Sequence, residues 1–128
     1  MIIKTVIVNG KEMRMGASAL IPRLYRHKFN RDMISDMNAL QKAFKKAAAL
    51  PEDATDEERN EAQLSALNLE IFENLAWIML KHAGENVGND PDEWLESIDG
   101  IFSIYEIFPT IMELWNENNV TTSTPRKK

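Results

Sequence analysis

The sequence predicts a mainly α-helical domain that begins with a short β-hairpin, an α+β fold. The first residues alternate apolar and polar side chains on either side of an Asn-Gly pair, which is typical of a hairpin. From residue 18 onward, apolar residues recur at the three- and four-residue spacing of amphipathic helices. Since 128 residues are enough for one domain, we expect residues 1–119 to fold as a single domain.

Residues 2–15 form the predicted hairpin. Asn9-Gly10 suits a two-residue type I′ turn, which needs positive φ at both central positions and fixes the register of the strands. The face expected to pack against the helices then contains Val6, Val8, Met13 and Met15. Ile3 and Ile7 fall on the opposite face. An intermolecular contact such as self-association is one explanation for them, and isolated surface apolar residues are the other.

Five helices are predicted to follow, over residues 18–28, 31–49, 56–83, 91–98 and 101–118. Pro22 is compatible with the first helix only in its opening turn, where a missing N–H costs little. Asn30 tolerates the left-handed conformation and is expected to end that helix. Thr55 and Glu58 have the spacing of a capping box, and Asp90 precedes a proline as an N-cap residue often does.

Apolar periodicity assigns an inward face to these helices. The expected inward residues are Leu20, Ile21, Leu24 and Tyr25 in the first helix and Ile34, Met37, Ala39, Leu40 and Phe44 in the second. The helix over 56–83 carries two apolar stripes, so we expect it at the centre of the core. Pro109 either kinks the last helix or opens a separate one. Residues 120–128 lack apolar periodicity and are expected to be a disordered basic tail.

Charge is distributed unevenly along the chain, although the total is only −5. Residues 1–50 carry a net charge of +7, residues 51–119 carry −15, and the last nine residues carry +3. One explanation is that the basic and acidic parts neutralise each other within the fold. The other is that faces of opposite sign meet neighbouring copies or a partner.

Residue types that support catalysis or metal binding are scarce. Cysteine is absent, and His27 and His82 each lack a second ligand at helical spacing, so we interpret both as structural. There is no glycine-rich phosphate loop and no apolar run of the roughly 20 residues that span a membrane. The sequence therefore predicts a cytoplasmic protein that is not an enzyme, with no catalytic, cofactor or metal site and no membrane contact.

The stretch RLYRHKFNR concentrates basic and aromatic residues near the end of the first predicted helix. Nucleic-acid binding would need exposed aromatic rings, whereas Tyr25 and Phe29 occupy positions typical of packed side chains, and the acidic half would repel phosphate. We therefore expect no nucleic acid. Arg23, Arg26 and Arg31 are instead candidate contacts with acidic residues of a neighbouring copy or a partner, and internal salt bridges are the alternative.

Several short motifs occur in a fairly specific order, and the chain from about residue 5 to 128 resembles a known family through them. The motifs are Ile21-Pro22-Arg23 with Tyr25-Arg26, Phe29 with Arg31-Asp32, Glu93-Trp94-Leu95, and Leu114-Trp115 with Asn118. Together they resemble the tail assembly chaperones of long-tailed phages and prophages of Gram-positive bacteria. Asn30 departs from the glycine that the family favours, and residues 51–63 match poorly.

The resemblance implies a non-enzymatic role. Such chaperones bind the tape measure protein, keep it soluble and recruit tail tube subunits in the host bacterial cytoplasm, and they are absent from the mature virion. They are commonly made in two lengths by ribosomal frameshifting, and the terminal Thr124-Pro125-Arg126-Lys127-Lys128 is compatible with a slippery run of lysine codons. The alternatives are a structural tail or connector protein and a small phage regulatory protein that binds nucleic acid.

Overall fold

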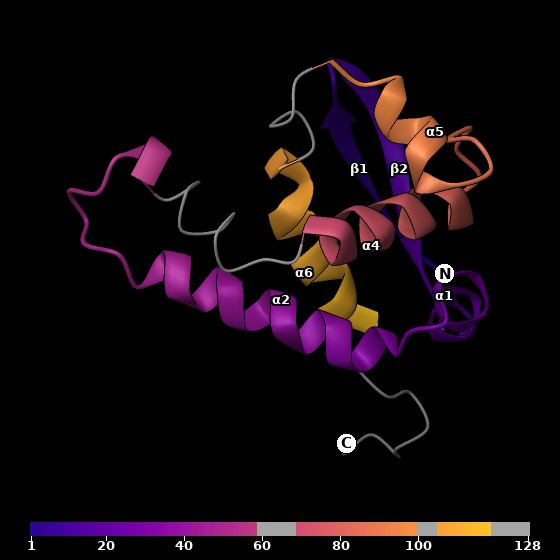
Figure 1. Cartoon of the computed structure of the whole chain (residues 1–128), viewed down its shortest axis with the longest axis horizontal. Coiled ribbons are helices and arrows are strands. Elements are labelled where there is room, and N and C mark those ends of the chain that lie inside the picture. The colour runs from indigo at the N-terminus through magenta and orange to yellow at the C-terminus, as the bar shows by residue number, and fades with distance from the viewer. Residues whose placement is uncertain (59–68, 100–104, 119–128) are drawn as a thin grey trace, which may run out of the picture. The chain divides into compact units, whose positions relative to one another are not determined.

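A computed structural model of the chain describes residues 1–58, 69–99 and 105–118 (Figure 1). It confirms the predicted fold class, a mainly helical protein with an antiparallel hairpin at the N-terminus. The described elements are β1 (Ile2–Val8), β2 (Lys11–Ala17), α1 (Ile21–Phe29), α2 (Met33–Ala48), α4 (Leu69–His82), α5 (Pro91–Glu96), the 3-10 helix η1 (Tyr105–Ile107) and α6 (Phe108–Asn118).

These elements belong to two compact units. The first comprises Met1–Ile21 with Ala76–Lys128, and the second comprises Pro22–Leu75, so the boundary falls within helix α4. The expectation of a single domain over residues 1–119 stays a prediction.

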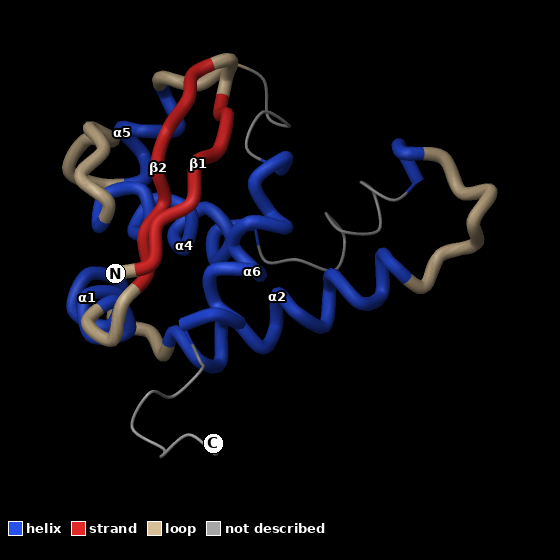
Figure 2. Tube along the Cα trace, turned by 180° about the vertical axis from the view of Figure 1, so that it is seen from behind, coloured by secondary structure: helices blue, strands red, loops and turns tan. Residues whose placement is uncertain are grey.

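The hairpin of the first unit has the predicted register and turn (Figure 2). Asn9 and Gly10 both have positive φ, 54° and 76°, and Val8 pairs with Lys11 directly beside them. The turn therefore fixes which side chains share a face. The four side chains that were expected to pack against the helices, Val6, Val8, Met13 and Met15, are all buried.

Helix α6 and η1 pack on the hairpin, with α6 in contact with both strands. The Lys4 ammonium lies 3.6 Å from a carboxylate oxygen of Glu113 and 3.3 Å from one of Glu117. These two salt bridges connect β1 to successive turns of α6. Pro109 is the second residue of α6, so it opens a separate helix rather than kinking a longer one. Residues 101–104 of the predicted helix lie outside the described residues.

Helix α5 is placed by its cap and by the loop before it. The Asp90 side chain accepts a hydrogen bond from the Glu93 N–H at 2.9 Å, and Pro91 occupies the first helical position, as predicted. Trp77 donates from Nε1 to the carbonyl oxygen of Val87 at 3.1 Å, which ties this loop to α4. The helix ends at Glu96, two residues earlier than predicted.

In the second unit, α1 and α2 are joined by a tight connection. Asn30 has a φ of 55° and ends α1, as predicted. Asp32 begins α2 by accepting from the Ile34 N–H and the Ser35 hydroxyl. Helix α1 starts at Ile21, three residues later than predicted, and α2 spans Met33–Ala48 rather than 31–49.

The predicted inward faces of α1 and α2 were wrong at three residues, Leu20, Ile34 and Ala39, which are exposed. The buried stripe of α2 consists of Met33, Asp36, Met37 and Leu40, at the spacing of a helical face. Ile34 follows Met33 by one residue and is turned away from that stripe, so it is 55% exposed. Ala39 and Leu20 are exposed as well, the latter because it lies before the helix begins. The side chain of Phe44 lies outside the described residues.

The predicted helix over 56–83 is described at its two ends. Thr55 and Glu58 form the expected capping box, since the Glu58 N–H donates to Thr55 Oγ1 at 3.0 Å and the Thr55 N–H donates back to Glu58 at 3.3 Å. Residues 56–58 are helical, residues 59–68 lie outside the described part, and α4 resumes at Leu69. Every residue of α4 from Ile71 to Leu80 except Glu73 and Asn74 is a buried apolar side chain, as expected of a central helix. The predicted tail over 120–128 also lies outside the described residues.

Candidate protein-binding surfaces

A buried hydrogen-bond network fixes the geometry of the basic helix α1. The Tyr25 hydroxyl donates to Asp36 Oδ2 at 2.6 Å, and Arg31 donates to both oxygens of the same carboxylate, from Nε at 2.8 Å and from Nη2 at 2.9 Å. Asp36 is only 3% exposed and Tyr25 is fully buried. This planar two-pronged contact is the strongest form of an arginine–carboxylate pair, and it links α1, the connection after it and α2.

The network shifts the ionisation of its members in the directions that this geometry implies. Hydrogen bonds from Arg31 hold the pKa of the Asp36 carboxyl below its ordinary value, against the effect of burial. Burial, together with the hydrogen bond to Asp36, raises the pKa of the Tyr25 phenol. Asp36 is therefore a charged acceptor, and Tyr25 remains a neutral donor.

Arg31 thus follows the alternative explanation, an internal salt bridge, which it forms with Asp36. The sequence analysis missed its partner, Asp36. A signal was present, because Asp36 lies three residues after Met33 and four before Leu40, on the apolar stripe of α2. An acidic residue at such a position needs a partner when the stripe is buried.

Arg23 and Arg26 lie on the exposed surface of α1, next to the exposed His27. Within the described part of the chain, neither guanidinium forms a salt bridge or a hydrogen bond. Tyr25 and Phe29, in contrast, pack on each other with ring centroids 4.9 Å apart. The guanidinium groups of Arg23 and Arg26 are therefore exposed, while the aromatic rings of this stretch are packed, as predicted. We call Arg23 and Arg26 the α1 cationic pair.

The outer face of the hairpin exposes two isoleucines on one strand. Ile3 is 44% exposed and Ile7 is 59% exposed, with Thr5 exposed between them. Because Val8 and Lys11 flank the two-residue turn as a hydrogen-bonded pair, the backbone N–H and C=O groups of residues 3, 5 and 7 point away from β2. In the sheet that the structure describes, β1 is thus an edge strand with exposed apolar side chains.

The opposite edge, along β2, has a partner within the chain. The Arg14 N–H donates to Glu85 Oε2 at 2.7 Å, and the Arg14 guanidinium lies 3.8 Å from the same oxygen. This contact occupies a backbone donor that an added strand would need. The two hairpin edges therefore differ, and the one that carries Ile3 and Ile7 is the more accessible.

His82 has a structural contact. Its Nε2 lies 2.8 Å from the Ser18 hydroxyl, and burial lowers the pKa of the imidazole. Among residues 1–58, 69–99 and 105–118, no three His, Asp or Glu side chains form a group that could hold a metal ion.

The Asp36 network predicts a specific loss of stability in acid. Because the pKa of Asp36 is lowered in the folded chain, the unfolded chain binds its proton first, and the contribution is complete above about pH 5 and is lost as the pH falls below about 4. We expect the difference in unfolding free energy between the wild type and Asp36→Asn to be largest at neutral pH and to shrink between pH 5 and pH 3. Urea unfolding at several pH values measures it. A difference that stays constant would contradict a stabilising charge on Asp36.

No described helix is long and apolar enough to cross a membrane. Comparison with known proteins gives no match: neither a family model, nor a curated protein, nor a solved structure is detectably similar to this chain. The described residues present two surfaces with exposed binding groups, the α1 cationic pair and the exposed β1 edge.

Proposed function

We propose that this chain is a non-catalytic protein-binding factor, a phage tail assembly chaperone that binds the tape measure protein, keeps it soluble and recruits tail tube subunits. The observation that supports it most directly is the α1 cationic pair. Arg23 and Arg26 occur within the motifs that resemble this family, and both are exposed on a helix that the Asp36 network holds in place. Side chains presented from a fixed helix lose less freedom on binding than side chains on a loop.

The chemistry of this surface favours an acidic protein partner over nucleic acid. Single-stranded nucleic acid is usually bound by exposed aromatic rings beside basic groups, and here Tyr25 is buried and packs against Phe29. The chain also carries −15 over residues 51–119, which opposes a polyanion as long as DNA. A local acidic patch of a protein carries less charge than DNA, so this repulsion is weaker, and the patch can still pair with Arg23 and Arg26.

The exposed β1 edge offers a second surface, for neighbouring copies or for tail tube subunits. Ile3 and Ile7 supply apolar area, and the backbone groups between them can pair with an extended segment. Many copies arranged along one long client would each contribute a weak contact, and the contacts would reinforce one another. On this proposal the protein acts in the host bacterial cytoplasm and does not remain in the virion.

A structural tail or connector protein is the main alternative, and a nucleic-acid-binding regulator is the other. The nucleotide sequence past codon 128 distinguishes a phage tail protein, whether chaperone or structural component, from an unrelated binding module. We expect a very long, helical open reading frame downstream, and an A-rich slippery heptamer at Lys127-Lys128 if the longer form is made. A downstream region without such a frame would contradict the assignment. Retention on DNA that weakens steeply with salt would favour the regulator instead.

A further inference from the structure

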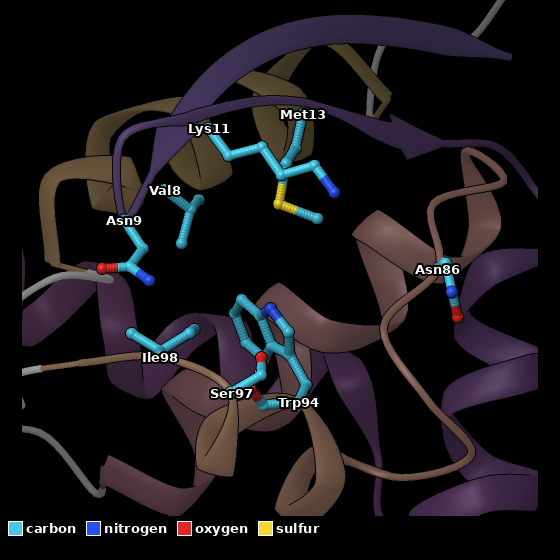
Figure 3. Close-up of a pocket in the computed structure, with 8 residues that line it drawn as sticks. All are labelled: Val8, Asn9, Lys11, Met13, Asn86, Trp94, Ser97 and Ile98. Carbon is cyan, nitrogen blue, oxygen red and sulfur yellow. The ribbon is translucent and has the colours of Figure 1, made fainter.

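A pocket in the first unit lies between the turn of the hairpin and helix α5 (Figure 3). Its volume is about 290 Å³, at the lower end of the roughly 300–1,000 Å³ of pockets that enclose a whole small ligand. Its walls are formed by Val8, Asn9, Lys11, Met13, Asn86, Trp94, Ser97 and Ile98. A space of this size is about twice the roughly 150 Å³ of a cavity that holds benzene, so it takes one large side chain and leaves room for a polar group beside it.

The inner wall of the pocket is apolar. Val8, Met13 and Trp94 are buried, and Figure 3 shows the Met13 thioether and the Trp94 ring facing each other across the space, with Ile98 beside them. Methionine sulfur and an indole ring make favourable contacts with a further aromatic or aliphatic group. The inner part of the site therefore suits a large apolar side chain.

The pocket also presents a hydrogen-bond donor. Trp94 is only 4% exposed, and its ring projects into the pocket with the indole nitrogen at the upper end in Figure 3. The Nε1–H of Trp77 donates to Val87, whereas no hydrogen bond from the Trp94 indole is described. Because no buried side-chain nitrogen or oxygen of the described residues lacks a partner, the Trp94 N–H is reached by water in the pocket, and a ligand oxygen that replaces this water can accept from it.

The mouth of the pocket carries a positive charge. Lys11 follows the hairpin turn, is exposed, and extends over the pocket in Figure 3. Its ammonium forms no salt bridge with the described acidic residues. Lys11 and the Trp94 N–H together favour a negatively charged acceptor, because a carboxylate can accept from both kinds of donor.

We propose that this pocket binds an anchor of a partner peptide, a large apolar side chain next to an acidic residue. The apolar group occupies the space between Met13 and Trp94, and the carboxylate accepts from the Trp94 N–H and pairs with Lys11. The peptide backbone stays outside because the pocket is too small to enclose it. This site is separate from the α1 cationic pair and does not depend on the role in tail assembly.

The test uses the full chain, labelled with ¹⁵N, and 3-phenylpropionate as the probe of the ring-plus-carboxylate chemistry. We expect a dissociation constant on the order of 1 mM, as for a small fragment. The indole N–H resonance of Trp94, assigned by its absence from the spectrum of Trp94→Phe, should move downfield as it donates to the carboxylate. The Trp77 resonance should stay in place because its N–H already has an acceptor.

Matched compounds and variants make the result specific. The neutral 3-phenylpropionamide should bind about tenfold more weakly, since it lacks the charge. Lys11→Gln should weaken binding of 3-phenylpropionate to about the level of the amide, whereas Lys42→Gln, on the exposed surface of α2, should leave it unchanged. Equal binding of the acid and the amide, or no movement of the Trp94 resonance at 20-fold excess over the expected dissociation constant, would overturn the proposal.

A second titration separates a peptide from a free small acid. The blocked peptide acetyl-Glu-Phe-Glu-amide should shift the same Trp94 resonance and bind at least as tightly as 3-phenylpropionate. If 3-phenylpropionate binds and the peptide does not, the occupant is a free acid, and the peptide proposal is wrong. Neither titration involves a tape measure protein, so its failure would be distinct from a failure of the proposed function.

Discussion

Replacing Asp36 by alanine is expected to lower the free energy of unfolding by about 2–3 kcal/mol. The variant leaves the fully buried Tyr25 hydroxyl without its acceptor at 2.6 Å and removes both acceptors of Arg31. Because Arg31 is about half exposed, its guanidinium can return to water, and most of the expected cost comes from the tyrosine and the lost packing. In a protein of this size we expect the thermal midpoint to fall by roughly 10 °C.

Two comparisons make this prediction specific. Asp36→Asn keeps an oxygen that Tyr25 can donate to, so it should cost less than Asp36→Ala. Glu57→Ala, an exposed acidic position with no described partner, should change the free energy of unfolding by less than about 0.5 kcal/mol. If Asp36→Ala were as stable as Glu57→Ala, the network would not be what holds α1 and α2 together.

Reversing the α1 cationic pair, with Arg23→Glu and Arg26→Glu together, is expected to weaken binding of the tape measure protein at least tenfold at low salt. Four units of charge change on a surface that we propose meets acidic residues, so attraction becomes repulsion. The effect should decrease at 0.5 M salt, where screening is stronger. The thermal midpoint should change little, because neither arginine has an ionic partner within the described part of the chain.

Helix α2 provides a matched control for this variant. Lys42 and Lys45 are exposed and are spaced three residues apart, as Arg23 and Arg26 are. Lys42→Glu with Lys45→Glu makes the same change in net charge at a different place. We expect this control to retain most of the affinity. Equal losses in the two double variants would show that binding responds to total charge and not to the α1 cationic pair.

Local chemistry explains why part of the fold could be predicted from the sequence. Asn9-Gly10 favours one turn type, and that turn determines the register of every strand pair, so the buried and exposed faces of the hairpin follow from two residues. The capping box of Thr55 and Glu58 and the N-cap at Asp90 are also local, since each involves groups three residues apart.

Features that depend on contacts between distant segments were harder to predict. Ile34 and Met33 are adjacent apolar residues, and only packing determines which of them is buried. In the sequence Arg31 resembles Arg23 and Arg26, and only its contact with Asp36 on the buried stripe of α2 distinguishes it from them. The pocket at Trp94 combines the hairpin turn with residues 86–98, and no sequence pattern links these segments.

The central claim is that this chain binds the tape measure protein and keeps it soluble, and co-expression tests it most directly. The measurement is the fraction of the tape measure protein in the soluble extract, with and without this chain, and the co-elution of the two on a sizing column. The account predicts that the wild-type chain raises the soluble fraction and co-elutes, and that the Arg23→Glu, Arg26→Glu variant does neither. A tape measure protein that remains insoluble beside the wild-type chain, or that is rescued equally by the variant, would contradict it.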